Sequence, residues 1–124
     1  MQPDEELSGA LWDMFRYAQR ALELSSAFTR ASVEHDDLAI LGLERVVQII
    51  GEAANHVPEA FQAEHPEIPW RKIIGMRHIL VHRYSVIDLD EVWQAVTVDS
   101  ADLVRQLPSL FEPVDAEVRD DLTP

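Results

Sequence analysis

Residues 36–57 read DDLAILGLERVVQIIGEAANHV, and this stretch decides the fold. Its apolar residues recur at intervals of four and three, which places them on one face of an α-helix: Ala39, Leu43, Val46, Ile50, Ala53 and Val57. Asp36 or Asp37 can cap the start of this helix, and Pro58 ends it. Gly42 and Gly51 have no side chain, so we expect a neighbouring helix to approach closely there.

The segments on either side also have helical spacing. The first helix is expected from about residue 4 to about residue 29, and its stripe repeats the same intervals: Leu7, Leu11, Met14, Ala18, Ala21, Ser25 and Phe28. Residues 29–34 are then the turn to the second helix. Residues 58–69 are expected to form a loop, with one helical turn at residues 59–64.

Two further helices follow this loop. The third is expected from Pro69 or Trp70 to about His82, because proline is favoured in the first helical turn. The fourth should open at Asp88, where residues 88–91 read as a capping box, and end near Pro108.

These elements predict an all-α fold, an antiparallel bundle of four to five helices. We expect one domain over residues 1–111 and an acidic C-terminal tail over residues 112–124. The apolar stripes of the first two helices are long enough to leave a surface for a homodimer.

Composition narrows the function classes. The chain has no cysteine, which excludes disulfides, thiolate metal sites and a cysteine nucleophile. Without a signal peptide or an apolar run of membrane-spanning length, it is expected to be cytoplasmic and to have no membrane partner. The formal charge is −13, which repels nucleic acid in general. Residues 70–84 nevertheless contain no acid and hold four of the ten bases: Arg71, Lys72, Arg77 and Arg83.

The chemistry of this basic segment suits RNA cleavage without a metal or cofactor. Such cleavage needs a base for the 2′-hydroxyl, an acid for the leaving 5′-oxygen and a fixed cation for the phosphate. Histidine suits both proton roles, and the arginine fork matches a phosphate. Arg77 and His82 are therefore the candidate catalytic residues, with His78 in support.

Other interpretations of these residues stay open. Histidine and arginine also stabilise a helix C-terminus through its dipole. The spacing of His78 and His82 suggests zinc, but no third ligand is evident, and no metal site is predicted. Glu52 could orient Arg77 or simply face solvent. Arg77 and His82 point about 140° apart on an ideal helix, so a two-fold axis that brings two copies together would complete the site.

Three motifs resemble the HepT-like family of HEPN-domain proteins, once catalogued as a domain of unknown function. Residues 44–54, ERVVQIIGEAA, look like its second helix, and residues 65–77, HPEIPWRKIIGMR, look like the approach to its third. Arg77, His82 and Tyr84 match the R-x4-H-x-Y signature of that family.

This resemblance implies a homodimeric HEPN bundle that acts as the toxin of a type VII toxin–antitoxin system. It implies a metal-independent endoribonuclease that leaves 2′,3′-cyclic phosphate and 5′-hydroxyl ends, with Arg77 and His82 catalytic. It also implies a nucleotidyltransferase antitoxin that transfers AMP to Tyr84. His78 is a departure, because the family usually has asparagine there.

Two other functions fit the same sequence. The first is a non-catalytic helical dimer that binds a nucleotide or a partner nucleotidyltransferase. The second is a plain structural bundle.

Overall fold

The computed structural model describes residues 3–83 and 87–111 of the 124-residue chain, and in these ranges all regular structure is helical. The elements are α1 (Pro3–Ser25), α2 (Arg30–Val33), α3 (Asp37–Asn55), α4 (Glu59–Glu64), α5 (Trp70–His82), α6 (Leu89–Gln94), the π-helix η2 (Ala95–Asp99), α7 (Ser100–Gln106) and the 3₁₀-helix η3 (Leu107–Leu110). This confirms the predicted all-α bundle. The predicted tail at residues 112–124 lies outside the described residues.

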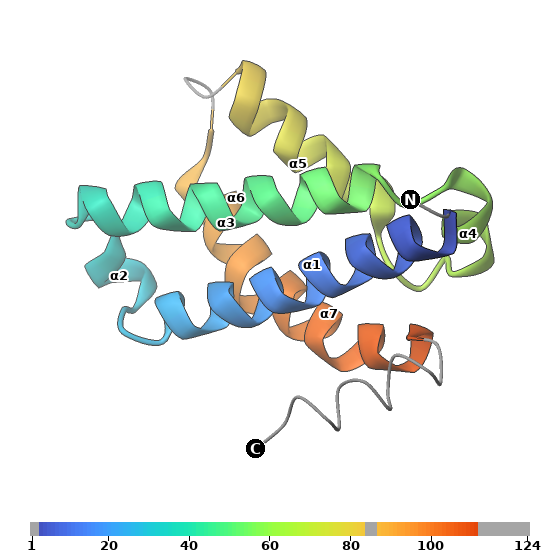
Figure 1. Ribbon diagram of the computed structural model, residues 1–124. Coiled ribbons are helices and arrows are strands. Elements are labelled where there is room, and N and C mark those ends of the chain that lie inside the picture. Colours follow the sequence, from blue (N-terminus) through green and yellow to red (C-terminus); the bar gives the residue numbers. More distant parts are fainter. Residues whose placement is uncertain (1–2, 84–86, 112–124) are drawn as a thin grey trace.

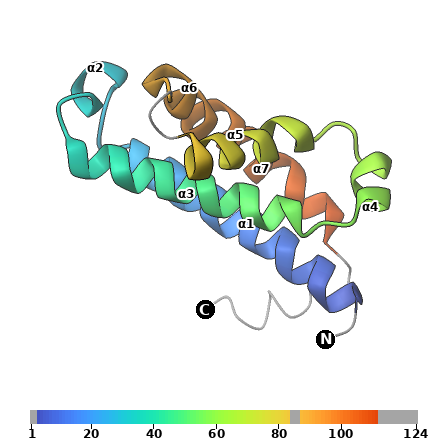
Figure 2. The same cartoon turned by 90° about the horizontal axis from the view of Figure 1, so that it is seen from above.

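An antiparallel pair of long helices forms the centre of the molecule. α1 and α3 lie side by side and are joined at one end through α2 (Figure 1). α5 packs against α3, whereas α7 packs against α1 (Figure 2). α5 also meets η2 through the ion pair between Lys72 and Asp99, and its remaining face points away from the other helices (Figure 1).

The interior consists of two apolar clusters along this pair. One lies around the N-terminal half of α1 and the C-terminal half of α3, and includes Met14, Ala54 and Leu107. The other lies around the opposite ends and includes Leu43 and Leu80. Leu80 therefore anchors the last turns of α5 in a cluster to which α3, α6 and η2 also contribute.

Local capping explains where the first two long helices end and begin. α1 ends at Ser25, earlier than the predicted Thr29, because Thr29 and Ser32 form a capping box that opens the short helix α2. The predicted turn therefore contains a helical turn of its own. The side chain of Asp36 accepts a hydrogen bond from the N–H of Ala39 at 3.0 Å, which confirms the predicted cap of α3.

The predicted fourth helix begins as expected but is not a uniform α-helix. The carboxylate of Asp88 caps it by accepting a hydrogen bond from the N–H of Asp90 at 2.8 Å, but the reciprocal bond from the Glu91 side chain that would complete the predicted capping box is absent from the described contacts. Residues 95–99 then form a π-helical turn, and the buried Ser100 hydroxyl donates to the carbonyl of Ala95 at 3.0 Å. No described helix combines the length and the apolar character needed to cross a bilayer.

Candidate functional site

The site predicted from the sequence lies on α5, which packs firmly on one face only. The Trp70 indole N–H donates to the carbonyl of His65 at 2.9 Å and fixes the start of the helix. Trp70, Ile73 and Leu80 are buried at helical spacing and form its inner face. The opposite face is therefore left for polar and charged side chains.

Arg77 lies on the side of α5 that approaches α3. A Cβ atom added to Gly51 of α3 would lie 3.1 Å from Cγ of Arg77 and still closer to its Cβ. Gly51 therefore lets the backbones of the two helices approach closely, as the sequence predicted. Gly42 does not share this role, because a Cβ added there would meet nothing within 4 Å. The expectation of a close helix approach at Gly42 is therefore wrong.

The Arg77 side chain is half-buried, and its Nε atom is buried without a hydrogen-bond partner among the described residues. It also forms no ion pair with any carboxylate in the described part of the chain. No neighbouring carboxylate within the described ranges therefore competes with an incoming anion for the guanidinium. This side chain can therefore receive an anionic group.

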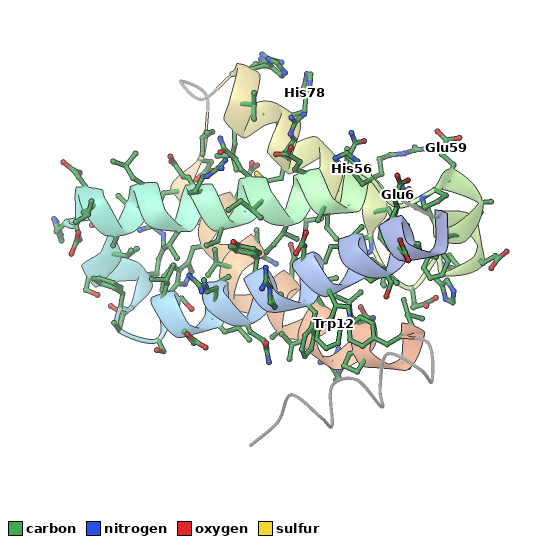
Figure 3. All side chains as sticks on the ribbon, viewed as in Figure 1. Glu6, Trp12, His56, Glu59 and His78 are labelled. Atoms are coloured by element: carbon green, nitrogen blue, oxygen red, sulfur yellow. The ribbon has the colours of Figure 1, made fainter. Side chains whose placement is uncertain are left out.

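His78 and His82 lie together on the exposed face of α5. Their ring centroids are 4.7 Å apart, with the ring planes tilted by 50°. Figure 3 shows His78 on the outer side of α5, away from α1 and α7. The structure thus brings these two imidazoles together at the end of the helix, while Arg77 leaves the same turns toward α3.

The other basic side chains of residues 70–84 differ in whether their charge is paired. Lys72 forms an ion pair with Asp99 at 3.0 Å, so its charge is already partnered. Arg71 and Arg83 are exposed, and the backbone N–H of Arg83 caps α5 through the carbonyl of Ile79. The basic segment therefore supplies fewer free charges than its sequence suggests.

The two glutamates of α3, Glu44 and Glu52, differ in their burial. Glu52 is exposed and forms no hydrogen bond with Arg77 among the described residues, so the structure gives no support for Glu52 orienting Arg77. Glu44 is half-buried, and its burial raises the pKa of its carboxyl above the ordinary value of 4.5. Glu44 lies two helical turns before Gly51 and thus on the same side of α3, a spacing that could have indicated its burial.

Tyr84, the predicted site of AMP transfer, lies outside the described residues. The described side chains offer two imidazoles and one unpaired guanidinium within two turns of one helix. This set can bind a phosphate and exchange protons with it, although Arg77 and His82 form no described contact within one copy of the chain.

Comparison with known proteins finds relatives that are named as ribonucleases. A protein named "Probable ribonuclease HepT" from Thermococcus cleftensis is 39% identical over 83 residues, which cover 64% of this chain and 76% of that protein. "Putative RNase MJ1380" from Methanocaldococcus jannaschii is 27% identical over 94 residues, which cover 76% of this chain and 86% of its own. No solved structure matches the chain at a significant level.

The family comparison covers more of the fold than either relative. The match to the family described as "Ribonuclease HepT-like" extends over residues 14–110, from the middle of α1 to the end of η3, and includes Arg77, His78 and His82. With most of its described helices inside that match, this chain belongs to the HepT-like ribonuclease family.

Proposed function

We propose that this chain is a metal-independent endoribonuclease whose site lies at the C-terminal end of α5. The observation that carries the proposal is the Arg77 side chain, half-buried and without a partner among the described residues, on the same turns as the exposed imidazoles of His78 and His82. Membership of a family described as ribonuclease-like supports RNA as the substrate.

The reaction follows from what these groups can do. One imidazole takes the proton of the ribose 2′-hydroxyl as its oxygen attacks phosphorus. The bond from phosphorus to the 5′-oxygen breaks, and a second, protonated imidazole gives its proton to that oxygen. The Arg77 guanidinium holds the negative charge that grows on the phosphate oxygens. The products are a 2′,3′-cyclic phosphate and a 5′-hydroxyl, with no net gain or loss of protons.

We propose that the active form is a homodimer, in which His82 of one copy and His82 of the other divide the two proton roles. Two exposed apolar side chains support such a contact: Val81, which precedes His82 on α5 and is 41% exposed, and Leu41 on the adjoining α3, which is 61% exposed. Light scattering on the purified chain tests this, and a monomer at micromolar concentration would contradict it.

The biological role that we propose is that of a toxin acting on cytoplasmic RNA. Its antitoxin would be a nucleotidyltransferase that adds AMP to Tyr84, which follows His82 by two residues in the sequence. An anionic AMP close to the site would occupy the phosphate position and neutralise Arg77. Intact mass after incubation with ATP and the nucleotidyltransferase tests this step. A mass gain that persists in Tyr84→Phe would rule out this residue.

Product analysis tests the ribonuclease reaction. The purified chain should cleave RNA in the presence of EDTA, and the 3′-terminal fragments should begin with a 5′-hydroxyl that polynucleotide kinase can label directly. An RNA with 2′-O-methyl groups throughout should resist, because its blocked oxygen cannot attack. Cleavage of the methylated RNA, or cleavage only with added metal, would contradict the proposed chemistry.

A further inference from the structure

We propose that His78 and His82 together bind one divalent transition-metal ion, such as Zn²⁺, and that this ion reversibly blocks the site. The binding part of the proposal stands on the geometry of α5 alone. The inhibitory part rests on the proposed ribonuclease function, because it requires that His82 transfers protons.

The geometry of the two rings matches the demands of a chelate. Residues four apart on a helix share a face, and this spacing of two histidines is the one that helical zinc sites use. In a tetrahedral site with Zn–N bonds of about 2.0 to 2.1 Å, two nitrogen ligands lie about 3.4 Å apart. Two imidazoles with centroids 4.7 Å apart can reach that separation by small rotations of their side chains. Both side chains are exposed and free to make them.

The surroundings make this an exchangeable site and not a closed structural one. No group of three or more histidine, cysteine, aspartate or glutamate side chains in the described ranges could hold a metal. The remaining ligands must therefore be water, or a second pair of histidines from another copy. The arginines at positions 77 and 83 lie nearby in sequence and lower the affinity by charge repulsion.

The choice of metal follows from the ligands. Imidazole nitrogen suits Zn²⁺, Ni²⁺ and Cu²⁺, whereas Mg²⁺ and Ca²⁺ prefer oxygen. A bound ion uses the same nitrogen lone pair that accepts a proton, so a metal-bound His82 can act neither as base nor as acid. Zinc should therefore inhibit RNA cleavage, while magnesium should not.

Calorimetry with ZnCl₂ alone tests the site on the full-length chain, in a buffer free of chelators at pH 7.5. We expect one ion per chain, or one per two chains where two copies share it. His78→Asn should weaken the affinity at least about tenfold, because the second ligand no longer acts at high effective concentration. His82→Asn should do the same.

His56→Asn provides the matched control, because His56 is an exposed histidine at the end of α3 with no histidine beside it on its helix. This variant should bind zinc as the natural chain does. Undiminished affinity in His78→Asn, or loss of binding in His56→Asn, would overturn the proposed site.

Cleavage assays separate this inference from the proposed function. The cleavage rate of each protein in zinc is divided by its own rate without zinc. The His78→Asn variant should need at least about tenfold more zinc than the natural chain for the same fractional loss of cleavage rate. If calorimetry shows the expected site but the chain never cleaves RNA, the ribonuclease proposal fails and the metal site stands. If the chain cleaves RNA but binds no zinc, the metal inference fails alone.

Discussion

Replacing Gly51 by alanine should force α3 and α5 apart at the level of Arg77. The added Cβ would lie 2.9 Å from the carbonyl oxygen of Ile73 and closer still to Cβ of Arg77. One of these atoms belongs to the α5 backbone, and the other is bonded to it. Rotation of a side chain therefore cannot relieve the clash, and the helix itself must move.

The expected cost follows from two opposing effects. Overpacking an interior contact destabilises a protein by about 1 to 3 kcal/mol. Replacing glycine by alanine inside a helix returns about 1 kcal/mol through helix propensity. Gly42→Ala on the same helix should show only the gain in helix propensity without the cost of overpacking, because its Cβ would have no neighbour within 4 Å. The free energy of unfolding should therefore be about 1 to 3 kcal/mol lower in Gly51→Ala than in Gly42→Ala.

Urea unfolding followed by circular dichroism measures both variants under the same conditions. Because the clash displaces Arg77, Gly51→Ala should also cleave RNA more slowly than Gly42→Ala. Equal unfolding free energies for the two variants would refute the close approach of α3 and α5 at this position, and with it the explanation of how Arg77 is held.

Two further substitutions test individual side chains. Burial raises the pKa of Glu44, so the folded chain binds its proton more tightly than the unfolded chain, and stability falls as the pH rises from 4.5 through the raised folded value. In urea unfolding, Glu44→Gln should therefore be more stable than the natural chain at pH 7 but equal to it at pH 4. A difference in unfolding free energy between the two proteins that does not grow with pH would contradict this. Arg77→Lys keeps the charge but loses the planar fork, so the cleavage rate should fall at least about tenfold without loss of stability. Unchanged cleavage in that variant would remove Arg77 from phosphate binding.

The long helices could be predicted from the sequence because their apolar spacing is a local property. The caps at Asp36 and Asp88 were predictable for the same reason. The helix α2 was missed, because four residues are too short to show a period. The π-helical turn was missed as well, because its residues 95–99 show no local pattern that distinguishes it from an α-helix.

In the candidate site, too, the features set by local sequence were predictable, whereas those set by contacts between distant segments were not. The position of His78 above His82 followed from helix geometry, and the structure confirms it. The ion pair between Lys72 and Asp99 joins segments 27 residues apart, so no local pattern could show that this charge is partnered. Gly42 and Gly51 look alike in the sequence, and only the partner helix distinguishes them. The catalytic roles of Arg77 and His82 and the homodimer stay predictions.

Cleavage of RNA by His82→Ala, in EDTA and beside His56→Ala as a control for the loss of an exposed histidine, tests the central claim most directly. Removing a group that transfers protons should lower the rate about a hundredfold or more, whereas His56→Ala should cleave at the natural rate. Both variants should keep the helical spectrum of the natural chain, because both imidazoles are exposed. A His82→Ala variant that cleaves RNA as fast as the natural chain would contradict an active site at the end of α5.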